Sequence, residues 1–563
     1  MQLSELEIIR REKLGQLRAL GINPYPADLY PVNHTSKAIK EQYTEGKKVI
    51  IAGRLMRKKI QGKASFAEIQ DSQGRIQVYF NRDEICSGED KMKYNELFKK
   101  LLDLGDFIGI EGELFTTQVG EITILVKDFK LLSKALKPLP LPKTDSQGNT
   151  YDEFIDPEMR YRQRYADLVV NPKVKEVFVK RTKLFTAMRD FFNNSGYFEV
   201  ETPILQSIPG GAAARPFQTH HNSLDIPMYM RIACELYLKK LIVGGFDGVY
   251  EFAKTFRNEG MDRTHNPEFT MMEIYVAYKD YNWMMDFTEE LLEYCATQVN
   301  GNSKTVFGDH EINFKAPYAR VTMTDAIKNF TGFDISDKTE NEIREAAKAM
   351  GIEVDNAMGK GKLIDEIFGQ KCEANYIQPT FITDYPKEMS PLTKEHRSNP
   401  ELTERFELII CGKELANAYS ELNDPIDQRE RFEDQVKLAG RGDDEATEFI
   451  DQDFLRALEY GMPPTSGMGI GMDRLIMFLT NNASIQEVLF FPQMKPEKKQ
   501  VAMSEDEKAV FNILKETSPI DLNSLKEQSG LSNKKWDKTI KGLTKNNLVK
   551  VEKTPEGMLV TMA

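Results

Sequence analysis

The chain of 563 residues carries a formal net charge of −12, with 29% charged and 40% hydrophobic residues. This length predicts two to four globular domains, and the absence of any apolar run near about 20 residues excludes a membrane-spanning protein. The acidic balance argues against a protein that coats nucleic acid by bulk charge, and five scattered cysteines without a CxxC pair argue against a disulfide framework or a zinc site.

Residues 1–45 are expected to form a helical segment followed by a Pro-containing stretch. The first residues, MQLSELEIIRREKLGQLRAL, are charged and have apolar residues at helical spacing. A secretory signal would instead have an uncharged apolar centre. Together with the cysteine content, this pattern leads us to expect a cytoplasmic protein without membrane attachment.

Residues 46–136 predict a small barrel. The segments KVIIAGRLM, SFAEIQDSQGRIQVYF, DFIGIEGELF and EITILVKDFKLL contain five short strands separated by turn residues. With one helical interruption at about 89–103, this count is typical of a Greek-key barrel of the OB type. The stretch RLMRKKIQGK (54–63) adds a locally basic face, and residues 137–150, which begin KPLPLPK, predict a stiff linker.

Residues 151–500 mix helices and strands without a βαβ rhythm. The sequence contains no GxxxxGK[ST] and no GxGxxG that opens a helix, so the nucleotide-binding folds marked by those motifs are not supported. Residues 320–375 predict a mainly helical insertion. From 501 to 563, three helix-length pieces precede a small hairpin, which is the order of a winged helix-turn-helix.

The stretch FRNEGMDRTHNPEFTMME (256–273) places charged residues around a hairpin loop. Arg257 and Glu259 follow a strand pattern. After the loop, strand alternation puts Phe269, Glu273 and Tyr275 on one face. For this segment alone, the alternative is an ordinary surface hairpin with cross-strand ion pairs.

The stretch RFELIICGKELANAYSELND (405–424) has Glu407, Glu414 and Glu421 at intervals of seven. A helix would stack them on one side, but the flanking apolar residues favour two strands joined across Gly412. Carboxylates beside apolar residues cost free energy unless they bind a cation. The segment therefore indicates either a cation site or a solvated acidic stripe.

The stretch GMGIGMDRLIMFLT (467–480) combines three glycines with a helix. Glycines at 467, 469 and 471 let the backbone approach a flat or bulky group. The apolar helix that follows carries a single arginine, Arg474. A purely structural arginine is the alternative to a binding role.

Taken together, these stretches resemble the three signature motifs of class II aminoacyl-tRNA synthetases. GYFEVETPILQSIPGGAAARPF (196–217) is similar to motif 1, FRNEGMDRTHNPEFTMME to motif 2 and GMGIGMDRL to motif 3. The segments GGAAARPF, ELYLK and SELNDP are similar to the corresponding sequences of lysyl-tRNA synthetases. The resemblance covers residues 1–500 and implies an α+β multidomain fold, with an OB-fold barrel and an antiparallel-sheet catalytic domain. The small winged-helix-like domain at 501–563 lies outside the family pattern.

The resemblance also implies roles for individual residues. ATP is bound in the family at positions that match Arg257, Glu259, His265, Asn266, Phe269, Glu414, Gly471 and Arg474, with Phe269 stacking on adenine. Lysine is bound at positions that match Gly211, Glu235, Arg257, Glu273, Tyr275, Asn417, Tyr419 and Glu421. Glu407 and Glu414 match magnesium ligands, with up to three Mg²⁺ ions accompanying ATP. Cys234 and Tyr419 stand where the family often has Pro and Phe.

The implied reaction is ATP-dependent. The lysine carboxylate attacks the α-phosphorus of ATP to give lysyl-adenylate and pyrophosphate, and a ribose hydroxyl at the 3′ end of tRNA(Lys) then takes the lysine. Arg257 and Arg474 stabilise the charge that develops, without a protein nucleophile. The implied partners are tRNA(Lys), ATP, L-lysine and a second copy of the chain in a homodimer.

The barrel is expected to read the anticodon of the tRNA. Phe66 and Gln77 match the family's anticodon-contact positions, and Arg57, Lys58 and Lys59 are expected to contact phosphates. From the residues alone, Phe66 is equally well explained as a core residue of the barrel.

Other functions remain open at this stage. The sequence of motif 2 and Glu235 disfavour an aspartyl- or asparaginyl-type synthetase. A lysyltransferase acting on a protein would lack the N-terminal barrel. A non-enzymatic nucleic-acid regulator would have no reason to keep Arg257, Glu414 and Arg474 together. In the tail, lysines and acidic residues nearly balance, so nucleic-acid binding is unsupported and a protein-contact role is equally open.

Overall fold

The computed structural model describes residues 3–144, 150–151, 153–212, 214–355, 358–439, 450–496, 503–546, 548–554 and 557–562. The chain forms two compact units, Met1–Gln493 and Met494–Ala563. The predicted boundary between residues 500 and 501 and part of the predicted linker 137–150 lie outside the described residues. Within the described ranges, no helix is both long and apolar enough to cross a membrane.

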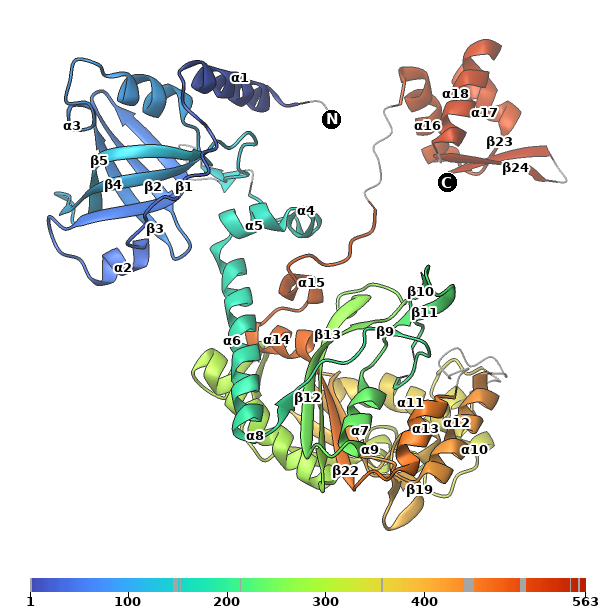
Figure 1. The fold of residues 1–563 in the computed structure, drawn as a ribbon. Helices are drawn as coiled ribbons and strands as arrows, with labels where there is room; N and C mark the ends of the chain where they lie inside the picture. The colour runs from blue at the N-terminus through green and yellow to red at the C-terminus, as the bar shows by residue number, and fades with distance from the viewer. Residues whose placement is uncertain are drawn as a thin grey trace. The chain divides into compact units, whose positions relative to one another are not determined.

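Five strands of the first unit close into a barrel in the order β1-β2-β3-β5-β4 (Figure 1). They are β1 (Lys48–Gln61), β2 (Ala64–Gln70), β3 (Arg75–Asn81), β4 (Phe107–Thr116) and β5 (Ile122–Ser133). Every second side chain of β2 and β3 is buried, because successive residues of a strand point to opposite faces. The Asp71 carboxylate holds the turn between them by accepting from the N–H groups of Gln73 and Gly74. The predicted OB-type barrel is confirmed.

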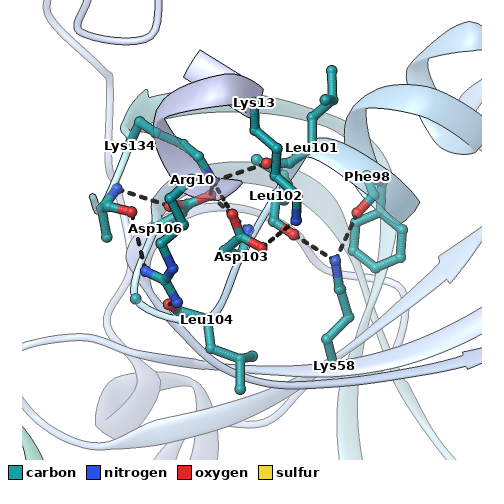
Figure 2. Close-up of polar contacts among 12 residues, drawn as sticks. Arg10, Lys13, Lys58, Phe98, Leu101, Leu102, Asp103, Leu104, Asp106 and Lys134 are labelled. Atoms are coloured by element: carbon teal, nitrogen blue, oxygen red, sulfur yellow. Dashed lines mark hydrogen bonds and ion pairs between the residues drawn. The ribbon is translucent and has the colours of Figure 1, made fainter. Parts of the chain in front are cut away.

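Helices accompany the barrel, and the sequence predicts the one at the start of the chain and the one at about 89–103 but not the short helices at 36–41 and 82–85. They are α1 (Glu5–Ala19), α2 (Ser36–Glu41), α3 (Arg82–Ile85) and a π-helix (Lys93–Leu101). The guanidinium of Arg10 in α1 donates to the carbonyl oxygens of Ala135 and Leu104 at 3.0 and 2.9 Å (Figure 2). Beside it, the buried ammonium of Lys134 lies 2.9 Å from Asp106. The ammonium of Lys134 is paired with a carboxylate and the guanidinium of Arg10 with carbonyl oxygens, which offsets the cost of burying these charges.

The second sheet of the first unit has eight strands in the order β16-β17-β20-β21-β22-β13-β12-β8. Their bounds are β8 (Phe198–Glu199), β12 (Gly248–Phe256), β13 (Glu268–Ala277), β16 (Ala319–Thr322), β17 (Thr380–Thr383), β20 (Arg405–Ile410), β21 (Lys413–Ser420) and β22 (Thr465–Gly471). The outer pairs β16–β17 and β8–β12 are parallel, and the pairs between them are antiparallel. This is the antiparallel-rich sheet that the resemblance implies.

The two faces of this sheet differ in chemistry. One face is apolar and packs against α6 (Pro172–Asn194), α8 (Tyr281–Asn300) and α14 (Met472–Thr480). Its buried strand residues include Met272, Ile274, Ala416, Ala418, Met468 and Ile470. Because side chains alternate along a strand, the residues between these point to the opposite face, and most of them are polar or glycine. The predicted site residues of the strands lie on this polar face.

The other elements of the first unit surround the sheet. The predicted insertion contains α9 (Met323–Thr331), α10 (Glu340–Ala349), α11 (Lys360–Lys371) and a 3₁₀ turn (Glu373–Asn375), with a core of their own. Further helices are α4 (Pro157–Arg162), α5 (Arg164–Val170), α7 (Glu235–Val243), α12 (Pro425–Ala439), α13 (Gln452–Glu459), α15 (Ile485–Val488) and a 3₁₀ turn (Lys387–Met389). Short strands are β6 (Lys143–Thr144), β7 (Thr150–Tyr151), β9 (Leu205–Gln206), β10 (Gln218–His221), β11 (Ile226–Met230), β14 (Lys304–Phe307), β15 (His310–Asn313), β18 (Glu395–His396) and β19 (Asn399–Thr403).

Over its described residues, the second unit contains three helices and a three-stranded sheet. Its elements are α16 (Glu505–Thr517), β23 (Ile520–Asp521), α17 (Leu522–Ser529), α18 (Asn533–Lys545), β24 (Val549–Thr554) and β25 (Gly557–Met562), with sheet order β23-β25-β24. Val510, Leu514, Leu525, Trp536 and Leu543 form its buried core. The three helices and the hairpin occur in the order expected from the sequence, and the winged-helix-like assignment stays a prediction.

Candidate active site

Two rows of residues cross the polar face of the large sheet. Directly opposed residues in an antiparallel pair point to the same face, and the strand register aligns β20, β21, β22 and β13. One row consists of Glu407, Asn417, Gly469 and Glu273, and the next of Arg405, Tyr419, Gly467 and Tyr275. The register therefore brings together predicted site residues that are far apart in the sequence.

Glycines in the middle of these rows let other side chains approach the backbone closely. A Cβ atom at Gly467 would lie 2.2 Å from Glu421 Oε1 and 2.3 Å from the Tyr275 ring. One at Gly469 would lie 3.0 Å from the side chain of Met271. The sequence predicts that these glycines let a flat or bulky group come close, and at Gly467 that group is the protein's own Tyr275.

Three buried carboxylates, those of Glu235, Glu273 and Glu421, form what we term the acidic cluster. Glu235 begins α7, Glu273 belongs to β13 and Glu421 follows β21. Burial and the charge of Glu235 raise the pKa of Glu273 to about 7. Burial likewise raises the pKa of Glu421 well above its ordinary range. Because buried negative charge is unfavourable without a partner, the acidic cluster favours the binding of a cation.

A fixed ammonium group, that of Lys239, lies within the acidic cluster. The Lys239 side chain is fully buried, and Nζ forms ion pairs with Glu235 Oε1 at 2.5 Å and with Glu421 Oε2. Burial alone would lower the pKa of Lys239, but Glu235 and Glu421 raise it above its ordinary value, so the ammonium stays charged. The sequence analysis missed this residue. The signal for Lys239 in the sequence was its i,i+4 spacing from Glu235 in ELYLK, because side chains four residues apart on a helix are neighbours.

The two positions that depart from the family pattern each donate a hydrogen bond to the acidic cluster. The Tyr419 hydroxyl lies 2.8 Å from both carboxylate oxygens of Glu235. The backbone N–H of Cys234 donates to Glu273 Oε1 at 3.3 Å, which a proline could not do because it has no N–H. The Tyr275 hydroxyl donates to the other Glu273 oxygen at 3.2 Å. These donors favour the ionised carboxylates.

Arg257 has the surroundings of an anion-binding residue. It follows the last residue of β12, and its guanidinium carbon lies 5.2 Å from the centroid of the Phe269 ring. Its Nε atom is buried and has no hydrogen-bond partner among the described residues. A buried donor without a partner is unfavourable, so a ligand oxygen would stabilise it. Arginine binds carboxylates and phosphates through paired hydrogen bonds.

Arg474, the third residue of α14, connects the hairpin loop with β21. Its guanidinium donates to the carbonyl oxygen of Glu414 at 2.5 Å and lies 3.5 Å from the Glu414 carboxylate. It also contacts His265 Nε2 at 3.4 Å, and His265 Nδ1 lies 2.8 Å from Asp262. Gly471, predicted to line the ATP site, caps the same helix. The structure thus joins predicted ATP-site residues from three separate stretches.

The other predicted residues of the hairpin loop differ in exposure. Asn266 is buried, donates to the Glu268 carbonyl at 2.6 Å and accepts from the N–H of Gln493 at 3.2 Å. These bonds hold the end of the loop against the end of the first unit. Glu259 is exposed, so the structure does not bring its side chain into the buried acidic cluster.

Gly211 and Asn417 lie beside charged groups of the site. Gly211 has a φ of +87°, and a Cβ there would lie 3.2 Å from the Glu235 Cβ, so both backbone conformation and space favour glycine. The Asn417 side-chain oxygen accepts from Arg405 Nε at 3.1 Å, and the same guanidinium lies 2.6 Å from Glu407. Arg405 therefore orients both residues. The sequence analysis did not single it out.

Glu407 and Glu414, predicted as magnesium ligands, lie on the paired strands β20 and β21. Burial and the charge of Glu414 raise the pKa of Glu407 to about 7. A cation shared by the two carboxylates would remove this effect. Within the described ranges, no group of three or more His, Cys, Asp or Glu is arranged to hold a metal. Two carboxylates fit Mg²⁺, because this ion takes its other ligands from phosphate and water oxygens.

The predicted anticodon residues lie on the outer face of the barrel. Phe66 and Gln77 alternate with buried residues of β2 and β3, so neither is a core residue. Phe66 is paired with Tyr79, and their ring centroids lie 4.9 Å apart. Gln77 Oε1 accepts from the Thr123 hydroxyl at 2.9 Å, and Arg57 is exposed on the neighbouring β1. Their role in anticodon binding stays a prediction.

The expectation that Lys58 contacts phosphates is wrong. Its ammonium donates to the carbonyl oxygens of Phe98, Lys99 and Leu102 at 3.1, 3.3 and 2.6 Å, and Figure 2 shows its contacts with Phe98 and Leu102. Burial lowers the pKa of Lys58 to about 8. The pairing of β1 with β2 shifts just before Arg57. This irregularity reverses the alternation of side chains, so Arg57 faces outward and Lys58 inward.

Comparison with known proteins identifies the class. Residues 156–495 match the family of class II tRNA synthetases (D, K and N), and residues 49–132 match the OB-fold nucleic acid binding domain family. The first match covers more than half of the chain and includes the large sheet with the acidic cluster, Arg257 and Arg474. The chain belongs to the class II tRNA synthetases (D, K and N).

Within this class, the chain is similar to lysine–tRNA ligases. It is 76% identical to the lysine–tRNA ligase of Christiangramia forsetii over 555 residues, 99% of this chain and 97% of that protein. It is 64% identical to that of Porphyromonas gingivalis over 525 residues, 92% and 90% of the two chains. It is 62% identical to that of Azobacteroides pseudotrichonymphae over 499 residues, 88% of this chain and 99% of that protein.

Proposed function

We propose that this chain is a lysine–tRNA ligase, which activates L-lysine with ATP and transfers the lysine to the 3′ end of tRNA(Lys). The acidic cluster carries the proposal. Its three carboxylates face one fixed ammonium, that of Lys239, so two negative charges remain for a ligand when all three are ionised. Lysine has two ammonium groups, whereas aspartate and asparagine have one. An aspartate-specific site would need a cation in place of these carboxylates.

Arg257 and Arg474 hold the anionic groups of the substrates. Arg257 binds the lysine carboxylate and the α-phosphate of ATP, and its unpartnered buried Nε supports this role. Phe269 offers its ring face to adenine, and Arg474 binds the far phosphates beside His265. The lysine carboxylate oxygen then bonds to the α-phosphorus as pyrophosphate leaves. The two arginines align the reactants and stabilise the developing negative charge, so no protein nucleophile is needed.

Glu407 and Glu414 would hold Mg²⁺, with up to three ions accompanying ATP. When bound, Mg²⁺ supplies positive charge that neutralises the ATP phosphates. Arg405 orients the Glu407 carboxylate at 2.6 Å. The raised pKa of Glu407 supports a site that is complete only with a cation.

The barrel binds the anticodon of tRNA(Lys). The paired rings of Phe66 and Tyr79 form an outward-facing platform on which an unpaired base stacks. Gln77 and Arg57 lie on the same part of the barrel and offer an amide and a guanidinium to a base and a phosphate.

The enzyme works as a homodimer in the cytoplasm. Phe198 of the edge strand β8 is 58% exposed, and its ring lies 5.7 Å from that of the exposed Phe246. Ile204 and Leu205, a few residues after β8, are also exposed. A second copy of the chain would cover these apolar side chains. Light scattering on the purified chain measures the oligomeric state and tests this part of the proposal.

Pyrophosphate exchange with each of the twenty amino acids tests the proposed activity. Lysine alone should support rapid exchange of pyrophosphate into ATP. Glu421→Gln should weaken this exchange strongly, because leaving one partner of a buried charge pair uncompensated costs about 3–5 kcal/mol. Exchange driven by aspartate or asparagine, or a Glu421→Gln variant with an unchanged lysine requirement, would overturn the proposal.

A further inference from the structure

The second unit divides its charges between two halves. Residues 503–532 contain three lysines and six acidic residues, whereas residues 533–562 contain seven lysines and three acidic residues, and neither half contains arginine. The near balance over the whole unit therefore combines an acidic half with a basic half. The basic half consists of α18 and the hairpin β24–β25.

The helix α18 sorts its residues onto opposite sides. Trp536, Thr539 and Leu543 are buried and pack into the core of the unit. Lys534, Lys538, Lys541 and Lys545 are all exposed. At about 100° per residue, these four lysines fall within about 60° of one another, on the side opposite the buried residues. We term this set the basic stripe.

The basic stripe keeps an excess of positive charge, because Asp537, three residues after Lys534 and four before Lys541, is the one acidic residue of α18. Two other lysines of the basic half have acidic partners, since Lys535 lies 3.6 Å from Asp506 and Lys550 lies 3.2 Å from Glu552. None of the four stripe lysines forms an ion pair with a residue in the described ranges. Like charges three and four residues apart on a helix repel one another. A polyanion lying along the stripe would relieve this repulsion.

We propose that the basic stripe binds the phosphate backbone of the tRNA substrate along one of its helical arms. This inference rests on the proposed function, because tRNA is the nucleic acid that the proposed reaction uses. The stripe spreads four charges over about 16 Å, which allows contact with several phosphates. Lysines bind phosphates as point charges, and contacts to phosphates carry no direct information on base sequence. The stripe therefore contributes affinity that does not depend on base sequence.

Two matched triple variants of the full chain test this inference. Lys538→Gln/Lys541→Gln/Lys545→Gln removes three charges of the stripe. The control, Lys508→Gln/Lys515→Gln/Lys526→Gln, removes three charges from the acidic half. Glutamine keeps the helix propensity close to that of lysine. Binding of the tRNA is measured by fluorescence titration between 50 and 200 mM salt, with duplex DNA of similar size as a second probe.

The stripe variant should bind tRNA about tenfold more weakly at low salt. Its plot of log affinity against log salt concentration should be less steep by about two to three, since each lost phosphate contact removes about one unit. The control should bind like the unchanged chain. Lys538→Arg/Lys541→Arg/Lys545→Arg should restore binding, which a purely structural effect of the glutamines would not allow.

Equal tRNA binding by the two glutamine variants would overturn the inference. So would tighter binding of the duplex DNA than of the tRNA, or failure of the arginine variant to bind. An acidic protein surface as the partner of the stripe would produce the first of these results. The assay of lysine-dependent pyrophosphate exchange contains no tRNA, so the rate of exchange should be the same in every variant as in the unchanged chain. If the unchanged chain showed no lysine-dependent pyrophosphate exchange, that result would instead contradict the proposed function.

Discussion

The ammonium of Lys239 lies 2.5 Å from the Glu235 carboxylate in a region from which solvent is excluded, and the same ammonium pairs with Glu421. One protein cation thus fixes two of the three carboxylates of the acidic cluster. Glu273 keeps its hydrogen bonds from Cys234 and Tyr275 and does not pair with Lys239 in the structure. The acidic cluster is therefore partly neutralised before any substrate binds.

Lys239→Met should destabilise the protein in a way that depends on pH. Without the ammonium, Glu235 and Glu421 are buried and uncompensated, which costs about 3–5 kcal/mol at pH 8. Burial raises the pKa of Glu421 in the folded state, so this carboxyl regains its proton as the pH falls, and the loss of stability becomes smaller toward pH 5. Thermal unfolding at both pH values measures this change.

Lys240→Met is the matched control. Lys240 is the next residue and pairs on the surface with Asp453 at 2.8 Å, so its loss should cost about 0–1 kcal/mol at either pH. Equal destabilisation of the Lys239→Met variant at pH 5 and pH 8 would mean that the ammonium does not compensate buried carboxylates.

Glu273→Gln should change how stability depends on pH in the absence of lysine. The pKa of Glu273 is raised from 4.5 to about 7, so between these values the folded state holds a proton that the unfolded state has lost. Stability therefore falls as the pH rises through this window, by about 3 kcal/mol for one such group. Glutamine does not titrate, so the variant should not lose this stability. Relative to the unchanged protein, its free energy of unfolding should therefore increase between pH 5 and pH 8.

Added lysine should make the unchanged protein, rather than the Glu273→Gln variant, the more stable of the two at pH 8. In the proposed lysine site, the substrate ammonium would compensate Glu273 in the unchanged protein, and the variant should need at least about tenfold more lysine for half-maximal exchange. Thermal shift assays with and without lysine separate the two effects. A pH dependence of unfolding that is identical in both proteins would exclude Glu273 as the titrating group.

Phe66→Ala should reduce tRNA charging about ten- to a hundredfold. Stacking of a base on an aromatic ring contributes about 1–3 kcal/mol, and Phe66 lies on the outer face of the barrel beside Tyr79. Lysine-dependent pyrophosphate exchange should be unchanged, because the residues proposed for that step belong to the large sheet and not to the barrel. Charging and exchange are measured on the same preparation.

Phe80→Ala serves as the comparison for a core residue. Phe80 is fully buried, so its loss should cost about 3–5 kcal/mol of stability. A Phe66→Ala variant that unfolds like Phe80→Ala, or that charges tRNA normally, would remove Phe66 from the anticodon site.

Deletion of residues 504–563 should leave pyrophosphate exchange intact. The second unit has its own buried core, and the relative from Azobacteroides pseudotrichonymphae is matched over 99% of its length by 499 residues of this chain. That relative is thus shorter by about the size of the second unit. A folded truncation without exchange activity would show that the unit completes the active site.

The sequence by itself determined the order of the parts and the location of the motifs. Turn residues and strand alternation are local properties, so the five barrel strands and the shared face of Phe269, Glu273 and Tyr275 could be predicted from neighbouring residues alone. The two strands around Gly412 were also predicted, because apolar neighbours excluded a simple acidic helix face. The long motif resemblances added the positions of Glu235, Arg257 and Arg474.

Only the tertiary structure decided which charged side chains contact one another. The i,i+4 spacing indicates the pair of Glu235 and Lys239, but no local pattern encodes the contact of Lys239 with the distant Glu421. The irregular pairing of β1 turned Lys58 inward, which a strict alternation of side chains does not predict. The basic stripe likewise emerged only when α18 buried Trp536 and Leu543, because burial of one helix face determines which charges remain in water.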